Sequence, residues 1–280
     1  MSDLNSTQTA QNEQIEQVVL LCSGDKCALA SQNIPYIVKN IAPKTIFVIT
    51  SAKNFGLLQN IKEKTPNFQL VNEDTMYDGL NFSSIKALAD EVYGEGQKRT
   101  GWYFQQFLKM AWAFNPLCAQ KYLVWDCDTF PLQKICLNWN DKTIFNIKSE
   151  VNTAYFDTLE AILGIKKQIA GSFISEFMYF EQKIMQEMVL QIENKANKNS
   201  GEAKLSFFQI ILNAVKQNGS PKAGFSEFET YGSYLFANYP QKMTFTSIPT
   251  MRNGANYCGM KPKKWQLWYI GRNHVTASFE

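Results

Sequence analysis

Two aspartates, Asp126 and Asp128, stand one residue apart directly after a run of apolar residues that ends at Trp125. Carboxylate oxygens are the ligands that hard divalent cations such as Mg²⁺ and Mn²⁺ prefer in proteins. A cation held in this way neutralises a diphosphate and acts as a Lewis acid toward a departing phosphate. The pair therefore predicts a site for a metal and a nucleoside diphosphate, with Asp128 as the direct metal ligand and Asp126 facing the ribose or a metal-bound water.

The same residues allow a second chemistry. The segment VWDCDT (124–129) matches the motif of phosphotransferases of the haloacid dehalogenase kind, in which the first aspartate, here Asp126, is the nucleophile. Those enzymes need further acids downstream to hold magnesium, and no aspartate follows Asp157. Their motif also lies near the amino end of the domain, whereas three predicted strands precede Asp126 here. Both points favour the metal–diphosphate site, and phosphoryl transfer stays the alternative.

The apolar pattern predicts the elements that position the two aspartates. Short apolar runs closed by turn residues predict buried parallel strands over 18–24 and 45–51, with a further strand around 69–71. A helix then follows, with apolar residues at helical spacing at Ile85, Leu88, Ala89 and Val92. Alternating strands and helices indicate an α/β fold. In such folds ligands bind beyond the carboxyl ends of the strands, where Asp126 and Asp128 stand.

The segment before this strand, RTGWYFQQFLKMAWAF (99–114), predicts a helix with two unlike faces. The apolar face consists of Phe104, Phe107, Leu108 and Ala111. The opposite face carries Trp102, Gln105, Gln106 and Lys109. A tryptophan beside two amides and a cation is unusual for a face that meets only solvent. We therefore predict that this helix contacts a bound nucleotide through Arg99, Tyr103, Gln106 and Lys109.

The second half of the chain begins near Asp141. The segment SFISEFMYF (172–180) predicts a strand, because it is rich in aromatic and β-branched residues. Glu176 stands inside this run, where an unpaired carboxylate is costly to bury. It therefore either faces an acceptor cleft or is neutralised by a basic partner. Helical spacing of apolar residues predicts later helices over 185–192, 207–214 and 228–239.

Two glutamates open the last of these helices. Ser226 and Glu229 have the S-x-x-E spacing of a capping box, which explains Glu229 structurally. Glu227 has no such explanation. A reaction that transfers a group directly onto a hydroxyl needs a carboxylate to take the proton of that hydroxyl. Glu227 and Glu229 are both candidates for that base.

Three stretches, GWYFQQFLKMAWA (101–113), YLVWDCDTFPL (122–132) and FSEFETYG (225–232), resemble glycosyltransferases of the GT-A fold. The resemblance is to poorly characterised bacterial members associated with surface-polysaccharide clusters. It implies an α/β fold with a Rossmann-like, mixed, mostly parallel central sheet flanked by helices, in a single continuous two-part domain. We expect a flexible polar leader, a nucleotide-sugar-binding half and an acceptor-binding half whose C-terminal segment closes over the site, over 1–16, 17–140 and 141–280.

The resemblance also implies an activity. We expect transfer of a hexose from a nucleoside-diphosphate sugar, with UDP as the nucleotide, to a saccharide or lipid-linked acceptor in surface glycan synthesis. Mn²⁺ or Mg²⁺ is the implied cofactor, held by Asp126 and Asp128. Trp125 and Asp126 would contact the donor at the end of their strand. Ser23 and Gly24, which end the first strand, would approach the nucleotide base.

A third metal ligand is predicted in the C-terminal part. The segment NYCGMKPKKW (256–265) is similar to the HYxGxxKPW segment of retaining galactosyltransferases and glycogenins, in which the histidine binds the metal. Asn256 stands in place of that histidine. His274, the one histidine of the chain, is the other candidate for the third ligand. The residues leave open whether transfer inverts or retains the anomeric configuration.

Composition excludes several classes of function. The chain carries 28 basic and 25 acidic residues, a formal net charge of +3. Its basic residues form no long block, and the nearest approach is Lys261, Lys263 and Lys264, so nucleic-acid binding is not indicated. The 6 cysteines form no CxxC pair and indicate neither a zinc knuckle nor a disulfide framework.

The sequence also suggests a location. The cysteine content fits a reducing cytoplasm. The first sixteen residues have neither the charged start nor the apolar run of a signal peptide, and no later run has the length of a membrane span. We expect at most a peripheral contact with the inner face of the membrane. A non-catalytic binder of sugar nucleotides or glycans is the third alternative, because the base and the third metal ligand are unassigned.

Overall fold

The protein was analysed as a computed structural model that describes residues 14–94, 98–198, 204–220 and 222–279. A five-stranded sheet at its centre has the order β3-β2-β1-β4-β8. The first four of these strands run parallel, and β8 pairs antiparallel with β4. The strands are β1 Gln17–Leu21, β2 Thr45–Thr50, β3 Phe68–Asn72, β4 Lys121–Asp126 and β8 Phe177–Glu181. The prediction of a mixed, mostly parallel α/β sheet is confirmed.

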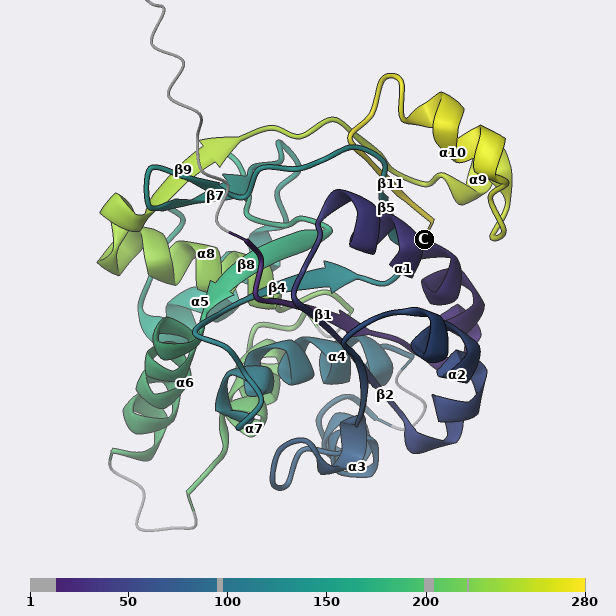
Figure 1. The fold of residues 1–280 in the computed structure, drawn as a ribbon. Coiled ribbons are helices and arrows are strands. Elements are labelled where there is room, and N and C mark those ends of the chain that lie inside the picture. The colour runs from purple at the N-terminus through teal and green to yellow at the C-terminus, as the bar shows by residue number, and fades with distance from the viewer. Residues whose placement is uncertain (1–13, 95–97, 199–203, 221, 280) are drawn as a thin grey trace, which may run out of the picture.

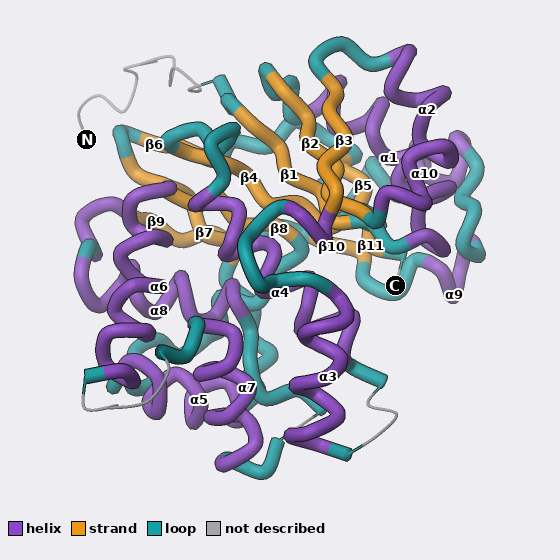
Figure 2. Tube along the Cα trace, turned by 90° about the horizontal axis from the view of Figure 1, so that it is seen from below, coloured by secondary structure: helices purple, strands orange, loops and turns teal. Residues whose placement is uncertain are grey.

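Helices cover both faces of this sheet (Figures 1 and 2). Successive strand residues point to opposite faces, so Val18 and Leu20 of β1 pack in one core with α1 and α2, and Val19 and Leu21 pack in the other core with α3 to α8. Because helices cover both faces of the sheet, its strands are apolar on both sides and appear in the sequence as continuous apolar runs. The helices are α1 Cys27–Asn40, α2 Phe55–Lys64, α3 Phe82–Tyr93, α4 Thr100–Ala111, α5 Thr153–Leu163, α6 Gln182–Asn197, α7 Phe207–Gln217 and α8 Glu227–Asn238.

Two small sheets border the central one. The first has the order β10-β11-β5 and brings the C-terminal part of the chain beside the residues that follow Asp128. The second has the order β6-β7-β9. Their strands, and the two short helices that precede β11, are β5 Thr129–Pro131, β6 Asn138–Trp139, β7 Lys142–Asn146, β9 Met243–Thr246, β10 Thr250–Met251, β11 Thr276–Ser278, α9 Ala255–Cys258 and α10 Lys264–Ile270.

The strand predicted over 172–180 is shorter in the structure. Strand β8 begins only at Phe177, and the preceding residues are held by other bonds. Ser172 forms an isolated bridge with Lys148, and the Glu229 carboxylate accepts hydrogen bonds from the Ser172 hydroxyl and the Phe173 backbone N–H. Because these bonds satisfy polar backbone groups of the segment before β8, the segment does not need to pair with a neighbouring strand.

The two predicted parts of the chain, 17–140 and 141–280, both contribute strands to the central sheet. Strand β8 comes from the 141–280 half, yet it pairs with β4 of the 17–140 half. Most of the predicted leader lies outside the described residues, but Ile15 is buried in the core beside α1. Within the described ranges, no helix is long and apolar enough to cross a membrane.

Gly232 of α8 generates a stability prediction, because a Cβ at this position would lie 2.3 Å from Cγ of Phe173. Gly232→Ala should therefore lower the free energy of unfolding by about 1–3 kcal/mol through overpacking, although alanine is the better helix former. Gly56→Ala in α2 is the control, since its Cβ would meet nothing within 4 Å. Urea unfolding should show equal or higher stability for Gly56→Ala, and equal behaviour of both variants would contradict the prediction.

Candidate active site

Asp126 and Asp128 lie at the carboxyl end of β4, as predicted. Asp126 is the last residue of the strand, and its backbone N–H donates to the carbonyl of Glu176 at 2.9 Å. The carbonyl of Asp128 accepts from the backbone N–H of Phe279 at 3.0 Å. A cavity of about 450 Å³ opens above the ends of β1 and β4 and is bordered by residues of α4 and α8. The main chain thus fixes both aspartates at the floor of a cavity.

Lys109 of α4 joins the first aspartate to the wall of the cavity. Its ammonium lies 3.0 Å from Asp126 Oδ1 and 2.8 Å from Glu227 Oε1, and 4.4 Å from the ring centroid of Phe228. Burial lowers the pKa of Lys109, but the two carboxylates outweigh it and raise the pKa above its ordinary value. Lys109 therefore stays charged and ties α4, β4 and α8 together.

Lys26 makes the matching contact to the second aspartate. It ends the short 3-10 helix that follows β1, and its ammonium lies 3.1 Å from Asp128 Oδ2 and 3.2 Å from the carbonyl oxygen of Phe279. The side chains of Lys26 and Asp128 are 22% and 18% exposed. One lysine thus links the start of the chain, the aspartate pair and the C-terminal segment.

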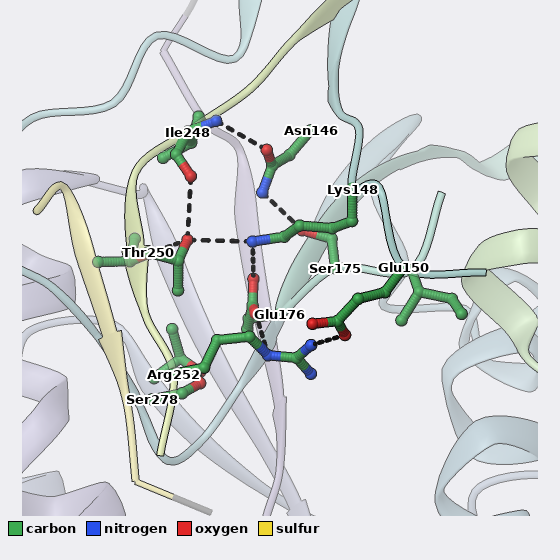
Figure 3. A network of polar contacts seen from close by, with 12 residues as sticks. Asn146, Lys148, Glu150, Ser175, Glu176, Ile248, Thr250, Arg252 and Ser278 are labelled. Atoms are coloured by element: carbon green, nitrogen blue, oxygen red, sulfur yellow. Dashed lines mark hydrogen bonds and ion pairs between the residues drawn. The ribbon is translucent and has the colours of Figure 1, made fainter. Parts of the chain in front are cut away.

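Glu176 lies at the third side of the cavity, in a network shown in Figure 3. Its carboxylate is buried, with Oε2 3.2 Å from Lys148 Nζ and Oε1 3.3 Å from Arg252 Nε. Lys148 also donates to Thr250 Oγ1 at 3.2 Å, and Arg252 also pairs with Glu150 at 2.6 Å. Glu176 therefore meets both alternatives that the sequence left open, because it lines the cavity and also has basic partners.

The charges around the cavity balance. Among the lining residues that the structure describes, the basic ones are Lys26, Arg99, Lys109 and Arg252. The acidic ones are Asp126, Asp128, Glu176 and Glu227. Burial raises the pKa of Asp126 to about 7. When Asp126 is ionised, the four basic and the four acidic charges cancel. A diphosphate entering this cavity therefore meets no surplus of positive charge unless it brings a cation with it.

Three of the predicted donor contacts from α4 line the cavity. Arg99, Gln106 and Lys109 follow one another at spacings of seven and three residues, so they share one helix face. Gln106 Oε1 also accepts from the backbone N–H of Glu227 at 3.1 Å, which holds the start of α8 against α4. Trp102, whose ring lies 5.4 Å from the Arg99 guanidinium, lines the cavity as well.

Tyr103 does not line the cavity. It is fully buried, its ring stacks on Phe107 and its hydroxyl accepts from the backbone N–H of Gly224 at 3.3 Å. The prediction placed Tyr103 with Gln106, but Tyr103 lies at the edge of that face, four residues before Phe107, and its ring packs on Phe107 in the core.

Trp125 also points away from the cavity. It is fully buried, stacks on Phe177 at 4.5 Å and donates from Nε1 to the carbonyl of Thr129 at 2.5 Å. Because neighbouring strand residues face opposite sides, Trp125 and Asp126 cannot both face the donor.

The two predicted contacts at the end of β1 separate in the same way. Ser23 lines the cavity. Gly24 is not among the lining residues, and a Cβ there would lie 2.9 Å from Oδ1 of Asn54. The close packing against Asn54 accounts for the glycine.

Glu227 and Glu229 have different surroundings. Glu227 lines the cavity, whereas Glu229 is buried behind it and accepts from Ser172 Oγ, the Phe173 backbone N–H and Ser233 Oγ. The Ser226 hydroxyl accepts from the Glu229 N–H at 3.3 Å, which is half of the predicted capping box. The return bond is replaced by the contacts to Ser172 and Phe173. This places Glu229 in the structural frame.

Neither of the two predicted third metal ligands, Asn256 and His274, is among the residues that line the cavity. Asn256 is exposed on α9, and His274 follows α10, near the end of β11 opposite to Phe279. Four residues of nearly extended chain lie between His274 and Phe279, so the two are roughly 15 Å apart at the rise of a strand. Within the described ranges, no three histidine, cysteine or acidic side chains gather as a metal site.

The aspartate pair alone still fits a divalent cation bound together with a diphosphate. Asp126 uses one oxygen for Lys109 and Asp128 uses one for Lys26, and each carboxylate has a second oxygen. Oxygen donors suit Mg²⁺ and Mn²⁺, which keep several ligand positions for water or phosphate. The balanced charge of the cavity is the observation that favours such a cation.

Sequence reasoning missed several lining residues. Lys26 and Arg252 contact the acidic residues of the site, and Tyr155 of α5 lines it. Lys26 had a usable signal, since it lies close after the first strand at the edge where ligands bind. Arg252 and Tyr155 had none, because only the tertiary fold brings them there.

No protein-family model matches the chain, and no curated protein sequence matches it. Similar solved structures include mouse xyloside xylosyltransferase 1, with a TM-score of 0.48, 9% identity and coverage of 94% of this chain and 97% of that one. An active-site mutant of LgtC has a TM-score of 0.46, 10% identity and coverage of 94% and 86%. The bifunctional glycosyltransferase WbbM has a TM-score of 0.46 and 15% identity, and the match covers 99% of this chain and 47% of the WbbM chain.

The ion bridge at Lys109 generates the next prediction. Lys109→Met leaves the Glu227 carboxylate buried without its cation and should lower the free energy of unfolding by about 2–4 kcal/mol. This is toward the lower end of the losses seen when a buried ion pair is broken, because Asp126 is partly exposed. Lys86→Met is the control, since its pair with Asp90 is exposed and should contribute less than about 1 kcal/mol. Adding Glu227→Gln to Lys109→Met should recover part of the loss. Equal unfolding midpoints in urea for Lys109→Met and Lys86→Met would contradict this account.

Glu229 generates a prediction on pH. Burial raises the pKa of Glu229, although the bonds from Ser172, Phe173 and Ser233 oppose the shift. A raised folded pKa means that the native state holds this proton more tightly than the unfolded chain. Its contribution to stability is therefore full below the unfolded pKa of about 4.3 and declines as pH rises through the folded pKa.

The test compares wild type with Glu229→Gln by urea unfolding from pH 4 upward. Relative to this variant, the wild type should lose stability with rising pH, because glutamine does not titrate. Glu229→Ala should be about 2–3 kcal/mol less stable than Glu229→Gln at every pH, since neither variant titrates and alanine leaves the Ser172 hydroxyl and the Phe173 N–H unpaired. A pH-independent difference between wild type and Glu229→Gln would refute the raised pKa.

Proposed function

We propose that this protein is a metal-dependent glycosyltransferase that moves a hexose from a nucleoside-diphosphate sugar, with UDP as the nucleotide, to a hydroxyl of a saccharide or lipid-linked acceptor. Surface glycan synthesis on the cytoplasmic side of the membrane is the setting that we propose. The observation that carries the proposal is the charge-balanced cavity with Asp126 and Asp128 on its floor. A cavity of this volume suits a ligand of nucleotide size.

Asp126 and Asp128 are the residues that would hold Mn²⁺ or Mg²⁺. When bound, such a cation would supply charge neutralisation for the diphosphate and for the departing nucleoside diphosphate. The ion pair with Lys109 holds the Asp126 carboxylate in place. Lys26 and Arg99 line the cavity as further cations, and the ammonium of Lys26 can turn from Asp128 toward a phosphate because lysine has a flexible stem.

Glu227 is our candidate for the group that takes the acceptor proton if transfer inverts configuration. It lines the cavity, and its Oε1 lies 2.8 Å from the ammonium of Lys109. Glu229 does not line the cavity, and its oxygens are already used by Ser172, Phe173 and Ser233. We therefore assign Glu229 to positioning the start of α8.

The donor site is tested by calorimetric titration of UDP in the presence and absence of Mn²⁺. Asp128→Asn and Asp126→Asn should each weaken Mn²⁺-dependent UDP binding by about tenfold or more, because a hydrogen-bonding amide is a poorer ligand than a carboxylate. Asp157→Asn is the control, since Asp157 is exposed on α5. A UDP affinity that neither depends on Mn²⁺ nor falls in the two variants would contradict the proposal.

Catalysis is tested separately by donor hydrolysis and transfer. Glu227→Gln should reduce turnover by about a hundredfold or more and leave UDP affinity nearly unchanged, whereas Glu229→Gln should keep most activity if the protein is folded. UDP binding without any turnover would support a non-catalytic binder instead. Phosphatase activity that Asp126→Asn abolishes would support the phosphotransferase.

A further inference from the structure

Exposed aromatic side chains gather on the C-terminal helices α9 and α10, away from the cavity. Trp265, Trp268 and Tyr269 of α10 are 64%, 68% and 62% exposed, and Tyr257 of α9 is 75% exposed. The three residues of α10 are spaced i, i+3, i+4 and so share one face. We call these four side chains, with the exposed Met260, the aromatic patch. Exposed apolar patches of this kind mark surfaces that bind a partner or a membrane.

The other face of α10 anchors the patch to the body of the protein. Leu267 and Ile270 are buried in a small core with Leu29 of α1 and Phe130 of β5. Helix α10 is therefore apolar on both faces, and its buried face fixes the outward direction of the tryptophans. Figure 1 shows α9 and α10 standing out from the molecule beside β5 and β11.

The patch is surrounded by positive charge. Lys261, Lys263, Lys264 and Arg272 are all exposed. The guanidinium of Arg272 lies 5.7 Å from the ring centroid of Trp268. No aspartate or glutamate occurs in the sequence from 230 to 279. The charge here is thus of one sign, although the chain as a whole is almost neutral.

We propose that the aromatic patch and its basic rim form a docking site for the surface of an anionic lipid bilayer. Tryptophan and tyrosine rings are favoured at the level of lipid head groups, because they combine an apolar body with a polar edge. Lysine and arginine beside them are attracted to anionic lipids. Aromatic residues, methionine and arginine are also common in protein–protein interfaces, but lysine, which supplies three of the four basic residues here, is depleted from them, so a protein partner fits less well. Helix α10 is too short to span a bilayer and would lie in the interface.

The docking site is connected directly to the cavity. The segment that carries it runs from Arg252, which lines the cavity, to Phe279, whose N–H donates to the carbonyl of Asp128, another lining residue. A bilayer bound at α9 and α10 would thus hold the cavity near the membrane surface. That a lipid-linked acceptor would be met there rests on the proposed function; the docking itself does not.

Co-sedimentation with vesicles tests the proposal. The full chain should bind vesicles of phosphatidylglycerol and phosphatidylethanolamine, bind phosphatidylcholine vesicles much less, and lose binding as salt is raised. Trp265→Ser combined with Trp268→Ser should lower the partition coefficient about tenfold or more, because the apolar area that enters the interface is removed. Lys263→Glu combined with Lys264→Glu should have a similar effect on the anionic vesicles alone.

The controls make changes of the same kind at other places on the surface. Trp139→Ser removes a tryptophan that is 51% exposed on β6, on the opposite side of the view in Figure 2. Lys183→Glu combined with Lys216→Glu makes the same charge change on α6 and α7. Both controls should bind the vesicles as the wild type does.

Three outcomes would overturn the proposal. They are a wild type that does not bind anionic vesicles at low salt, controls that lose binding as much as the patch variants, and a dimer in size-exclusion chromatography that Trp265→Ser with Trp268→Ser converts to a monomer. The last would show that a second copy of the chain covers the patch. Mn²⁺-dependent UDP binding in the same variants reports on the cavity, so failure of docking and failure of the proposed function are distinguished.

Discussion

The arrangement of the site depends on one buried ion bridge, in which the ammonium of Lys109 satisfies Asp126 and Glu227 together. The three residues come from α4, β4 and α8, so the bridge joins the strand that ends at the cavity to two helices from different halves of the chain. Removing one member leaves an unpaired charge in a poorly solvated place, which is costly even where the intact pair adds little net stability. The bridge therefore fixes geometry more than it adds stability.

The same pairing principle extends around the cavity. Lys26 holds Asp128, and Glu176 lies between Lys148 and Arg252 (Figure 3). Each buried acid thus has a cation close to it, which leaves the empty cavity close to neutral and its side chains preorganised. Such a site can accept a doubly charged ligand only with a matching cation or by letting a lysine change partners. This is the physical link between the structure and the metal-dependent chemistry that we propose.

The start of α8 shows how one short segment takes two tasks. Glu227 and Glu229 are two residues apart, which on a helix turns their side chains about 200° from each other. One therefore faces the cavity and the other the interior, where it satisfies the backbone of the segment before β8. The C-terminal segment is divided in a similar way, because Leu267 and Ile270 face the body while the tryptophans of α10 face outward.

The sequence by itself determined the α/β alternation, the strand that carries Asp126 and Asp128 at its end, and the helix face of Gln106 and Lys109. These features follow from local periodicity and burial, which nearby residues encode. Strand alternation already requires Trp125 and Asp126 to face opposite sides. Only the tertiary structure decided that Asp126 is the one that lines the cavity, that Tyr103 packs in the core, and that Lys26, Arg252 and Phe279 contact the acidic residues. Those contacts join residues up to 253 positions apart, such as Lys26 and Phe279. No local pattern specifies them, because they arise from how the helices and strands pack around a shared core.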